Sequence, residues 1–384
     1  MKPILWIVSE LFYPEESATA FILTNIAQTM KEKYSVKVIA GEPVYETVKD
    51  EKQLPEIDIY RVRGSRIDKN NIFQRIKRAL FLSKYFADEL NKKTSPGDKV
   101  LAVTNPAFNI LNIAKVCKKK NLNLIILAHD IFPENTISAG LLKANNPIYR
   151  ILVRKFNKAY GVAKKVIVIG DDMNQIIQKK VDNAHTKVVT IPNWANTSDL
   201  KYASYSQKEK IIIKFAGNIG RVQGIGKIIE IINNIHNPFL HFIFQGNGAC
   251  KELIKNSGLN NVEYLPPYQR REEQIILTEC TIGLVTLDSR MFGLGVPSKS
   301  YNLMASGRPI LFVGPENSEI YNFVRANNIG WAFDINKKEQ IISFLNSLSL
   351  NDFASFEEKG KKAREIAEEY LSKEIILNRF LEEI

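Results

Sequence analysis

Cysteine is scarce in this sequence, and long apolar runs are absent. Cys117, Cys250 and Cys280 are the only cysteines in 384 residues, at spacings that fit neither a disulfide framework nor a zinc site. A reducing compartment suits such a chain best. No uninterrupted apolar stretch reaches the roughly 18 residues of a membrane-spanning helix, so none is expected. The apolar start at 4–8 stops too soon for a signal peptide and predicts a buried first strand.

The chain is basic, and the excess lies in its first half. The formal net charge is +12. Counted on the printed sequence, residues 1–190 hold 31 Lys and Arg against 19 Asp and Glu, whereas residues 191–384 hold 22 of each. A charge excess confined to one half indicates an anionic partner for that half, such as a membrane surface, a nucleic acid or a phosphorylated substrate.

Short apolar runs alternate with amphipathic stretches throughout. Runs of this length between turn residues are typical of buried parallel strands, here predicted at 4–8, 36–40, 57–62, 99–104, 124–128, 165–169, 187–191, 211–216, 240–244, 262–265, 282–286, 309–313 and 330–333. Predicted helices include 19–33, 72–93, 108–120, 143–164 and 225–236. The pattern predicts an α/β fold of two doubly wound domains, 1–192 and 193–369, with a hinge at 192–198 and a C-terminal helix, about 370–384, packed on the first domain.

In doubly wound sheets, ligands bind beyond the carboxyl ends of the strands, and two facing domains place that site in a cleft. Ser17, Ala18 and Thr19 begin the first predicted helix, whose free N–H groups suit a phosphate. An ordinary N-cap by Ser17 or Thr19 is the alternative. His129 and Asp130 directly follow the strand 124–128, where they suit proton transfer or binding of a sugar hydroxyl; the alternative is a loop histidine with a structural hydrogen bond.

Glycine-rich loops carry cations in the second half. Gly220, Arg221 and Lys227 lie in the loop after 211–216, where close backbone approach and positive charge suit a diphosphate. This loop is not a Walker A motif, because Ile228 stands where Ser or Thr is needed. Ser298 and Lys299 begin a later helix, a position that also favours phosphate.

Residues 61–93 are strongly basic and amphipathic. They hold ten Lys and Arg against three acids, with Phe73, Ile76, Leu80, Phe81 and Phe86 interleaved. The pattern predicts contact with an anionic membrane surface through the cations Arg75, Lys77, Arg78 and Lys84. The alternative is a solvated helix whose aromatic side chains face the core. No nucleic-acid recognition motif accompanies the charge, so no nucleic-acid partner is expected.

Five segments, in order, resemble the family 4 retaining glycosyltransferases. They are FYPEESATA (12–20), HDIFPEN (129–135), IPNWANTSDL (191–200), GNIGRVQG (217–224) and VPSKSYNLMASGRPI (296–310). The chain is most similar to the branch that assembles O-antigen, capsule and exopolysaccharide, such as the fucosamine-type transferases. The resemblance implies a GT-B fold, with acceptor binding mainly in the first domain and donor binding in the second.

The resemblance also implies roles for individual residues. The donor diphosphate would contact Gly220, Arg221, Lys227, Ser298 and Lys299; the base and ribose would contact Gly246, Gly248, Leu265, Tyr268 and Asn302; and His129 or Asp130 would touch the transferred sugar. No metal or cofactor is implied, and the co-substrate is a nucleotide sugar, with UDP favoured. The expected acceptor is lipid-linked or saccharide, and the expected location is cytoplasmic, peripheral at the inner face of the cell membrane.

One departure from the family pattern affects the donor site. The family carries two glutamates eight positions apart, and these align with Leu294 and Asn302. Asn302 can still hydrogen-bond a ribose hydroxyl but carries no charge. This departure leaves open a non-enzymatic homologue that binds a nucleotide sugar. A sugar-nucleotide 2-epimerase, which can share the same architecture, is a second alternative.

Overall fold

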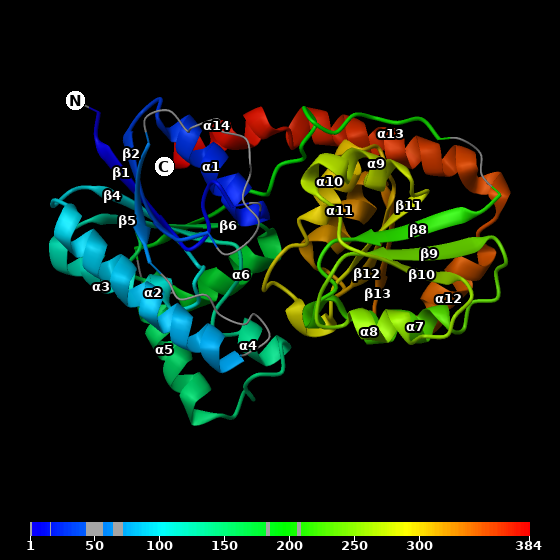
Figure 1. The fold of residues 1–384 in the computed structure, drawn as a ribbon, viewed down its shortest axis with the longest axis horizontal. Coiled ribbons are helices and arrows are strands. Elements are labelled where there is room, and N and C mark those ends of the chain that lie inside the picture. The colour runs from blue at the N-terminus through cyan, green and yellow to red at the C-terminus, as the bar shows by residue number, and fades with distance from the viewer. Residues whose placement is uncertain (1, 16, 44–56, 64–71, 182–184, 206–208) are drawn as a thin grey trace. The chain divides into compact units, whose positions relative to one another are not determined.

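The computed structural model describes residues 2–15, 17–43, 57–63, 72–181, 185–205 and 209–384 (Figure 1). The chain forms two compact units. The first unit comprises Met1–Thr136, Leu142–Ile191 and Leu377–Ile384, and the second comprises Ile137–Leu141 and Pro192–Ile376. None of the described helices is both long enough and apolar enough to cross a membrane.

The first unit contains a seven-stranded parallel sheet in the order β3-β2-β1-β4-β5-β6-β7. Its elements are β1 Ile4–Ser9, α1 Ala18–Met30, β2 Ser35–Gly41, β3 Asp58–Val62, α2 Ile72–Lys93, β4 Lys99–Val103, α3 Asn109–Lys120, β5 Asn123–Ala128, α4 Asn135–Ser138, α5 Pro147–Tyr160, β6 Lys165–Val168, α6 Asp171–Lys180 and β7 Lys187–Thr190. The helix α3 packs against both α2 and α5, so these three helices form one layer (Figure 1).

The second unit contains a six-stranded parallel sheet in the order β10-β9-β8-β11-β12-β13. Its elements are β8 Ile211–Ala216, η1 Arg221–Gln223, α7 Ile225–Ile232, β9 Leu240–Gln245, α8 Lys251–Lys255, β10 Val262–Leu265, η2 Arg270–Glu272, α9 Glu273–Thr278, β11 Ile282–Thr286, η3 Ser289–Met291, α10 Lys299–Ala305, β12 Ile310–Gly314, α11 Glu319–Asn327, β13 Gly330–Asp334, α12 Lys338–Ser347, η4 Leu350–Asp352, α13 Phe353–Tyr370 and α14 Lys373–Glu383, the last of which continues into the first unit.

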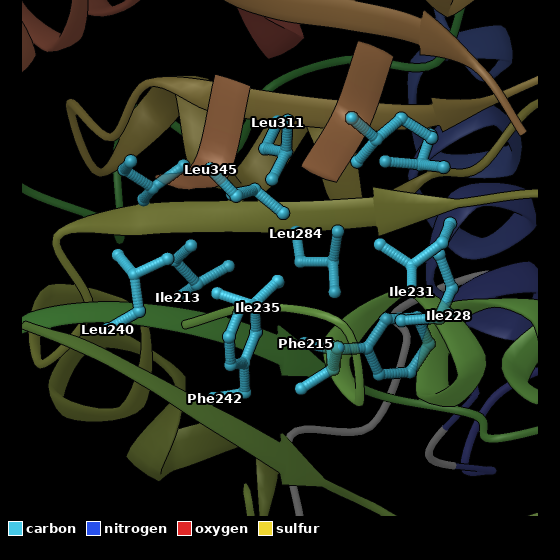
Figure 2. Packing of buried hydrophobic residues seen from close by; sticks show 14 of the residues in the cluster. Ile213, Phe215, Ile228, Ile231, Ile235, Leu240, Phe242, Leu284, Leu311 and Leu345 are labelled. Atoms are coloured by element: carbon cyan, nitrogen blue, oxygen red, sulfur yellow. The ribbon is translucent and has the colours of Figure 1, made fainter. Parts of the chain in front are cut away.

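The core of the second unit lies between its sheet and the helices α7 and α12. Figure 2 shows Phe215 and Leu284, from neighbouring strands, beside Ile228 and Ile231 of α7, with Leu345 of α12 on the same side. All five side chains are nearly or fully buried. Burial of such aliphatic and aromatic side chains supplies most of the stabilisation of the unit.

Every strand predicted from the sequence is present, with ends within one residue. Three helices, α1, α5 and α7, are shorter than predicted, and α1 ends at Met30 instead of 33. The side chain of Asn146 caps α5 by accepting a hydrogen bond from the Ile148 N–H, and Pro147 occupies the first position of the helix. These are strong start signals, so the residues before Asn146 are not helical. Similarly, α7 ends at Ile232 instead of continuing to 236.

The end of the chain packs against the first unit. Tyr34 donates a hydrogen bond from its hydroxyl to the Ile384 carbonyl at 2.9 Å, and Arg379 donates to the Thr190 carbonyl at 2.7 Å. Glu383 forms an ion pair with Lys165 at 2.6 Å. Since these contacts join residues about two hundred or more positions apart, the last residues are part of the first unit's structure.

Candidate nucleotide-sugar site

The strand order reverses at one point in each sheet, between β1 and β4 in the first unit and between β8 and β11 in the second. Ligands of doubly wound sheets bind beyond the carboxyl ends of the strands at such points. In the second unit the loop after β8, which holds Gly220 and Arg221, and the loop after β11, which leads to Ser298 and Lys299, both begin there. The fold thus puts the predicted diphosphate residues on two loops that flank a switch point.

The loop after β8 is fixed by the loop after β9. Gly217 donates from its N–H to the Gln245 carbonyl, and Ile219 donates to the Asn247 carbonyl, both at 2.8 Å. Gly246 has a φ of +149°, and a Cβ there would lie 1.9 Å from the Gly217 oxygen; a Cβ on Gly248 would lie 2.3 Å from the Ile219 oxygen. Only glycine fits at both positions, because backbone packs directly on backbone.

Lys299, the first residue of α10, points its ammonium into the second unit. The nitrogen lies 3.1 Å from the centroid of the Phe215 ring, and a Cβ on Gly217 would lie 3.8 Å from it. It is buried and has no hydrogen-bond acceptor among the residues that the structure describes, and burial holds the pKa of this ammonium well below its usual value. An uncompensated cation in the interior is unfavourable, and an anion at the Gly217 loop would relieve it.

The other predicted diphosphate residues are less closely gathered. Arg221 and Ser298 are exposed, and Gly220 is buried at the start of η1. The Lys227 ammonium donates to the side-chain oxygen of Asn336, after β13, at 2.7 Å. Lys227 therefore already has an acceptor, unlike Lys299.

A carboxylate that the sequence analysis missed lies beside Asn302. The Asn302 amide donates to Glu273 Oε1 at 2.8 Å. Tyr268 lies near the same carboxyl group, and burial, followed by the charge of Glu273, raises the pKa of its hydroxyl. Leu265, at the end of β10, accepts a hydrogen bond from the Gly246 N–H at 3.1 Å. Tyr268 and Asn302, two of the predicted base and ribose residues, thus share Glu273 as a neighbour, and Leu265 holds the Gly246 loop.

In the first unit, His129 and Asp130 follow β5 and are both half-buried. Burial lowers the pKa of His129 to about 4 and raises the pKa of Asp130 to about 6. At neutral pH the pair is therefore a neutral imidazole beside a mostly ionised carboxylate. His129 Nε2 is buried without a hydrogen-bond partner among the described residues, and Asp130 Oδ2 accepts from Asn135 at 3.2 Å.

An ion pair anchors the loop that carries these two residues. The Lys180 ammonium of α6 pairs with Glu134 and also donates to the side-chain oxygen of Asn157 on α5 at 3.0 Å. The Lys180 side chain is only 6% exposed, so the pair is shielded from solvent screening. Residues 129–135 are consequently held between α5 and α6.

The remaining predicted residues of the first unit have mixed outcomes. Ser17 is the N-cap of α1 and accepts from the Ala20 N–H at 3.2 Å, the ordinary role that was the alternative for this loop; Ala18 is exposed and Thr19 half-buried. Lys77 and Lys84 are exposed on α2. Arg78 is different: it is 6% exposed and pairs with Glu10 at 2.9 Å.

The inclusion of Arg78 in the membrane-facing set was therefore wrong, because its guanidinium neutralises an internal carboxylate. The side chain of Arg75 and the residues Arg66 and Lys69 of the basic segment lie outside the described part of the chain. Lys77 and Lys84 are the described members of the predicted membrane-contact set that face solvent.

Comparison with known proteins identifies similar glycosyltransferases. No family model matches the sequence. The chain is 30% identical to the probable glycosyltransferase WbjE of Pseudomonas aeruginosa, over 98% of this chain and 96% of that one. It is 22% identical to the putative colanic acid biosynthesis glycosyl transferase WcaI of Escherichia coli, over 80% of each chain.

Among solved structures, HepE of Anabaena in complex with UDP superposes with a TM-score of 0.68 and 16% identity, covering 100% of this chain and 99% of that one. At that identity the likeness concerns the fold alone. It confirms the GT-B fold predicted from the sequence, with two parallel-sheet α/β units.

Proposed function

The chain belongs to the glycosyltransferase family of WbjE, and from that premise we propose that it transfers a hexosyl group from a nucleotide diphosphate sugar to a lipid-linked or saccharide acceptor. The proposed setting is the synthesis of a cell-surface polysaccharide, the process named for WcaI. UDP is the favoured nucleotide, as the nucleotide bound by HepE supports. Both relatives, WbjE and WcaI, are named as glycosyltransferases, which favours neither a 2-epimerase nor a non-enzymatic binding protein.

The buried, unpartnered ammonium of Lys299 is the observation that carries this proposal. A diphosphate bound at the loop after β8 would contact this cation and would accept hydrogen bonds from backbone N–H groups of a glycine-rich turn. Arg221 lies on the loop after β8 and Ser298 on the loop after β11. Both side chains are exposed, so both are candidates for further phosphate contacts. Cations fixed in advance stabilise the charge that develops on a departing diphosphate.

The pair Glu273 and Asn302 suits a ribose. Asn302 follows Lys299 by three positions on α10, so the two side chains leave neighbouring points of the helix surface. A ribose bound at Asn302 and Glu273 would therefore lie next to a phosphate bound at Lys299. The carboxylate accepts hydrogen bonds from hydroxyl groups, and Asn302 orients it. Tyr268 and Leu265 would then border the base.

In the proposed reaction the bond between the sugar and the diphosphate breaks, and an acceptor hydroxyl attacks the sugar carbon and loses its proton. Retention follows if the hydroxyl attacks from the face that the diphosphate leaves, with a diphosphate oxygen accepting the proton. His129 is neutral at pH 7, so it binds a sugar hydroxyl as a donor or acceptor and not as a cation. Asp130 would hold a second hydroxyl through its carboxylate.

The proposed location is the cytoplasmic face of the cell membrane, where lipid-linked acceptors are assembled. Lys77 and Lys84, exposed on α2 beside Leu80 and Phe81, support contact with anionic lipid headgroups.

Thermal unfolding in the presence of UDP, GDP and their sugars tests the proposal. One sugar nucleotide should stabilise the protein, and Lys299→Ala should abolish the shift, whereas Lys362→Ala, an exposed lysine on α13, should leave it unchanged. Transfer is then followed with that donor and a lipid-linked saccharide. Binding without transfer or hydrolysis would favour the non-enzymatic alternative, and release of an epimerised donor would favour the epimerase. No shift with any nucleotide would contradict the proposed donor site.

A further inference from the structure

The layer formed by α2, α3 and α5 holds an unusual share of positive charge. These three helices carry fourteen Lys and Arg against two acids, Asp88 and Glu89, both on α2. The excess equals the net charge of the whole chain, +12. Helices α3 and α5 contain no acid at all. The rest of the sequence is balanced, so the charge asymmetry of the chain belongs to this one layer.

The N-terminal half of α5 has no buried side chain. From Pro147 to Lys155 every residue is exposed or half-buried, and the first buried side chain is Phe156. Ile148 is 60% exposed and Ile151 is 50% exposed. With Leu152 and Lys155 they follow the spacing of one helical face, and Arg150 and Arg154 follow the adjacent one. The described residues leave Ile148 and Ile151 of this stripe largely open to solvent.

The α2 helix repeats the combination of apolar and basic side chains. Ile76, Leu80, Phe81 and Tyr85 are 42–49% exposed on α2, with Lys77 and Lys84 exposed between them. Between α2 and α5, α3 exposes Lys115, Lys118 and Lys119. Figure 1 shows the three helices in the same part of the first unit, and α3 contacts both others. Their outer side chains therefore share one surface.

We propose that this surface, the outer face of α2, α3 and α5, docks on an anionic lipid bilayer, and that α5 inserts Ile148 and Ile151 at the level of the headgroups. The inference rests on the peripheral location proposed above and extends it from α2 to the whole layer. Aliphatic side chains enter the boundary between headgroups and acyl chains, while neighbouring Arg and Lys contact lipid phosphates. The first half of α5, which has no buried side chain, is the inserting element.

Charge argues against other partners for this surface. A second copy of the chain would face it with like charges, because α3 and α5 offer no acid to pair with. A nucleic acid would match the charge, but its phosphates and sugars give exposed isoleucines no apolar environment. A bilayer of anionic lipids satisfies both the cations and the isoleucines.

Vesicle flotation tests the proposal with the full chain. Vesicles of phosphatidylcholine containing phosphatidylglycerol should bind the protein, and vesicles of phosphatidylcholine alone should not. The double variant Ile148→Asp, Ile151→Asp should lose binding, and Arg150→Glu, Arg154→Glu should weaken it by at least about tenfold, as each cation near an anionic surface contributes about fivefold. Tyr370→Asp, at a side chain of the second unit that is 63% exposed, is the matched control and should bind as the parent does.

Two outcomes would overturn the inference. One is equal vesicle binding by the parent and both α5 variants. The other is a parent without vesicle affinity that dimerises, or binds nucleic acid, through Ile148 and Ile151. Thermal stabilisation by UDP, measured on the same variants, separates this test from that of the donor site. A variant that loses vesicle binding but keeps its stabilisation by UDP has an altered docking surface and an intact donor site. A variant that binds vesicles but is not stabilised by UDP has an altered donor site alone.

Discussion

Glu273 and Asn302, which are 29 positions apart in sequence, are joined by a hydrogen bond of 2.8 Å from the asparagine amide to the glutamate carboxylate. The resemblance to the family 4 transferases implies a glutamate at the position of Asn302, and in this chain Glu273 supplies a carboxylate beside it. The pair makes the proposed donor site testable at a residue that the sequence analysis did not identify.

Substitution of Glu273 should impair recognition of the ribose. We expect Glu273→Ala to weaken UDP binding by about tenfold or more, since a hydrogen bond to a charged group contributes roughly 1.5–3 kcal/mol. The parent should bind 2′-deoxy-UDP less tightly than UDP, and the variant should lose this discrimination. Calorimetric titration with both nucleotides measures the two effects. Equal losses for UDP and 2′-deoxy-UDP would assign Glu273 a structural role only.

Lys299 should lower stability while supporting ligand binding. Burial depresses the pKa of its ammonium in the folded protein, so below the ordinary lysine pKa the unfolded chain binds a proton more readily than the folded one. Replacement by Met removes this penalty, and the free energy of unfolding at pH 7 should stay constant or rise. UDP binding should fall at least about tenfold.

Urea unfolding and UDP titration of Lys299→Met check this prediction. The parent should also take up a proton as UDP binds, because the diphosphate restores the charged form, whereas the Met variant should not. Titrations in two buffers with different ionisation enthalpies detect that proton. A variant that is clearly less stable than the parent would contradict the account of the buried cation.

His129 and Asp130 should give opposite pH dependences of stability. The pKa of His129 falls from 6.5 to about 4 on folding, so its contribution to stability decreases as the pH drops from about 6.5 to 4. The pKa of Asp130 rises from 3.8 to about 6, so its contribution increases as the pH drops from about 6 to 4. Each effect is of the order of 3 kcal/mol, and in the parent they largely cancel.

Single substitutions should separate the contributions of His129 and Asp130 to the pH dependence of stability. Asp130→Asn should lose stability more steeply than the parent between pH 6.5 and 4, and His129→Gln should lose it less steeply. Urea unfolding of the three proteins at several pH values measures the slopes. Parallel curves for parent and variants would show that burial does not shift these two groups as described.

Gly246 and Gly248 should be intolerant of a side chain. A Cβ on Gly246 would overlap the Gly217 carbonyl at 1.9 Å, and the strain of relieving such an overlap should reduce the free energy of unfolding by about 3 kcal/mol or more. Gly226, exposed on α7, has its nearest neighbour at 4.0 Å, so Gly226→Ala should stabilise by about 0.5–1 kcal/mol. In chemical denaturation, the unfolding midpoint should therefore move to lower denaturant concentration for Gly246→Ala and to higher concentration for Gly226→Ala.

Local patterns predicted the strands because each is a short apolar run closed by polar or turn residues, as at 211–216. The limits of α5 were predicted less accurately, since the amphipathic pattern begins before the N-cap at Asn146. The partner of Arg78 and the pairing of Glu273 with Asn302 could not be predicted, because both join residues that only the folded chain brings together. The charge of a helix is visible in sequence, but which of its cations face inward is decided by packing.

The interlocked loops after β8 and β9 limit how this site can be redesigned or can diverge. Residues 217–219 and 245–248 are tied by main-chain hydrogen bonds and by glycines that leave no room for a side chain, so neither loop can adopt a new course alone. A grafted loop from another transferase would have to bring its counterpart with it. Altered preference for a donor is therefore expected to arise from exchange of side chains on α9 and α10, around a backbone cradle that stays the same.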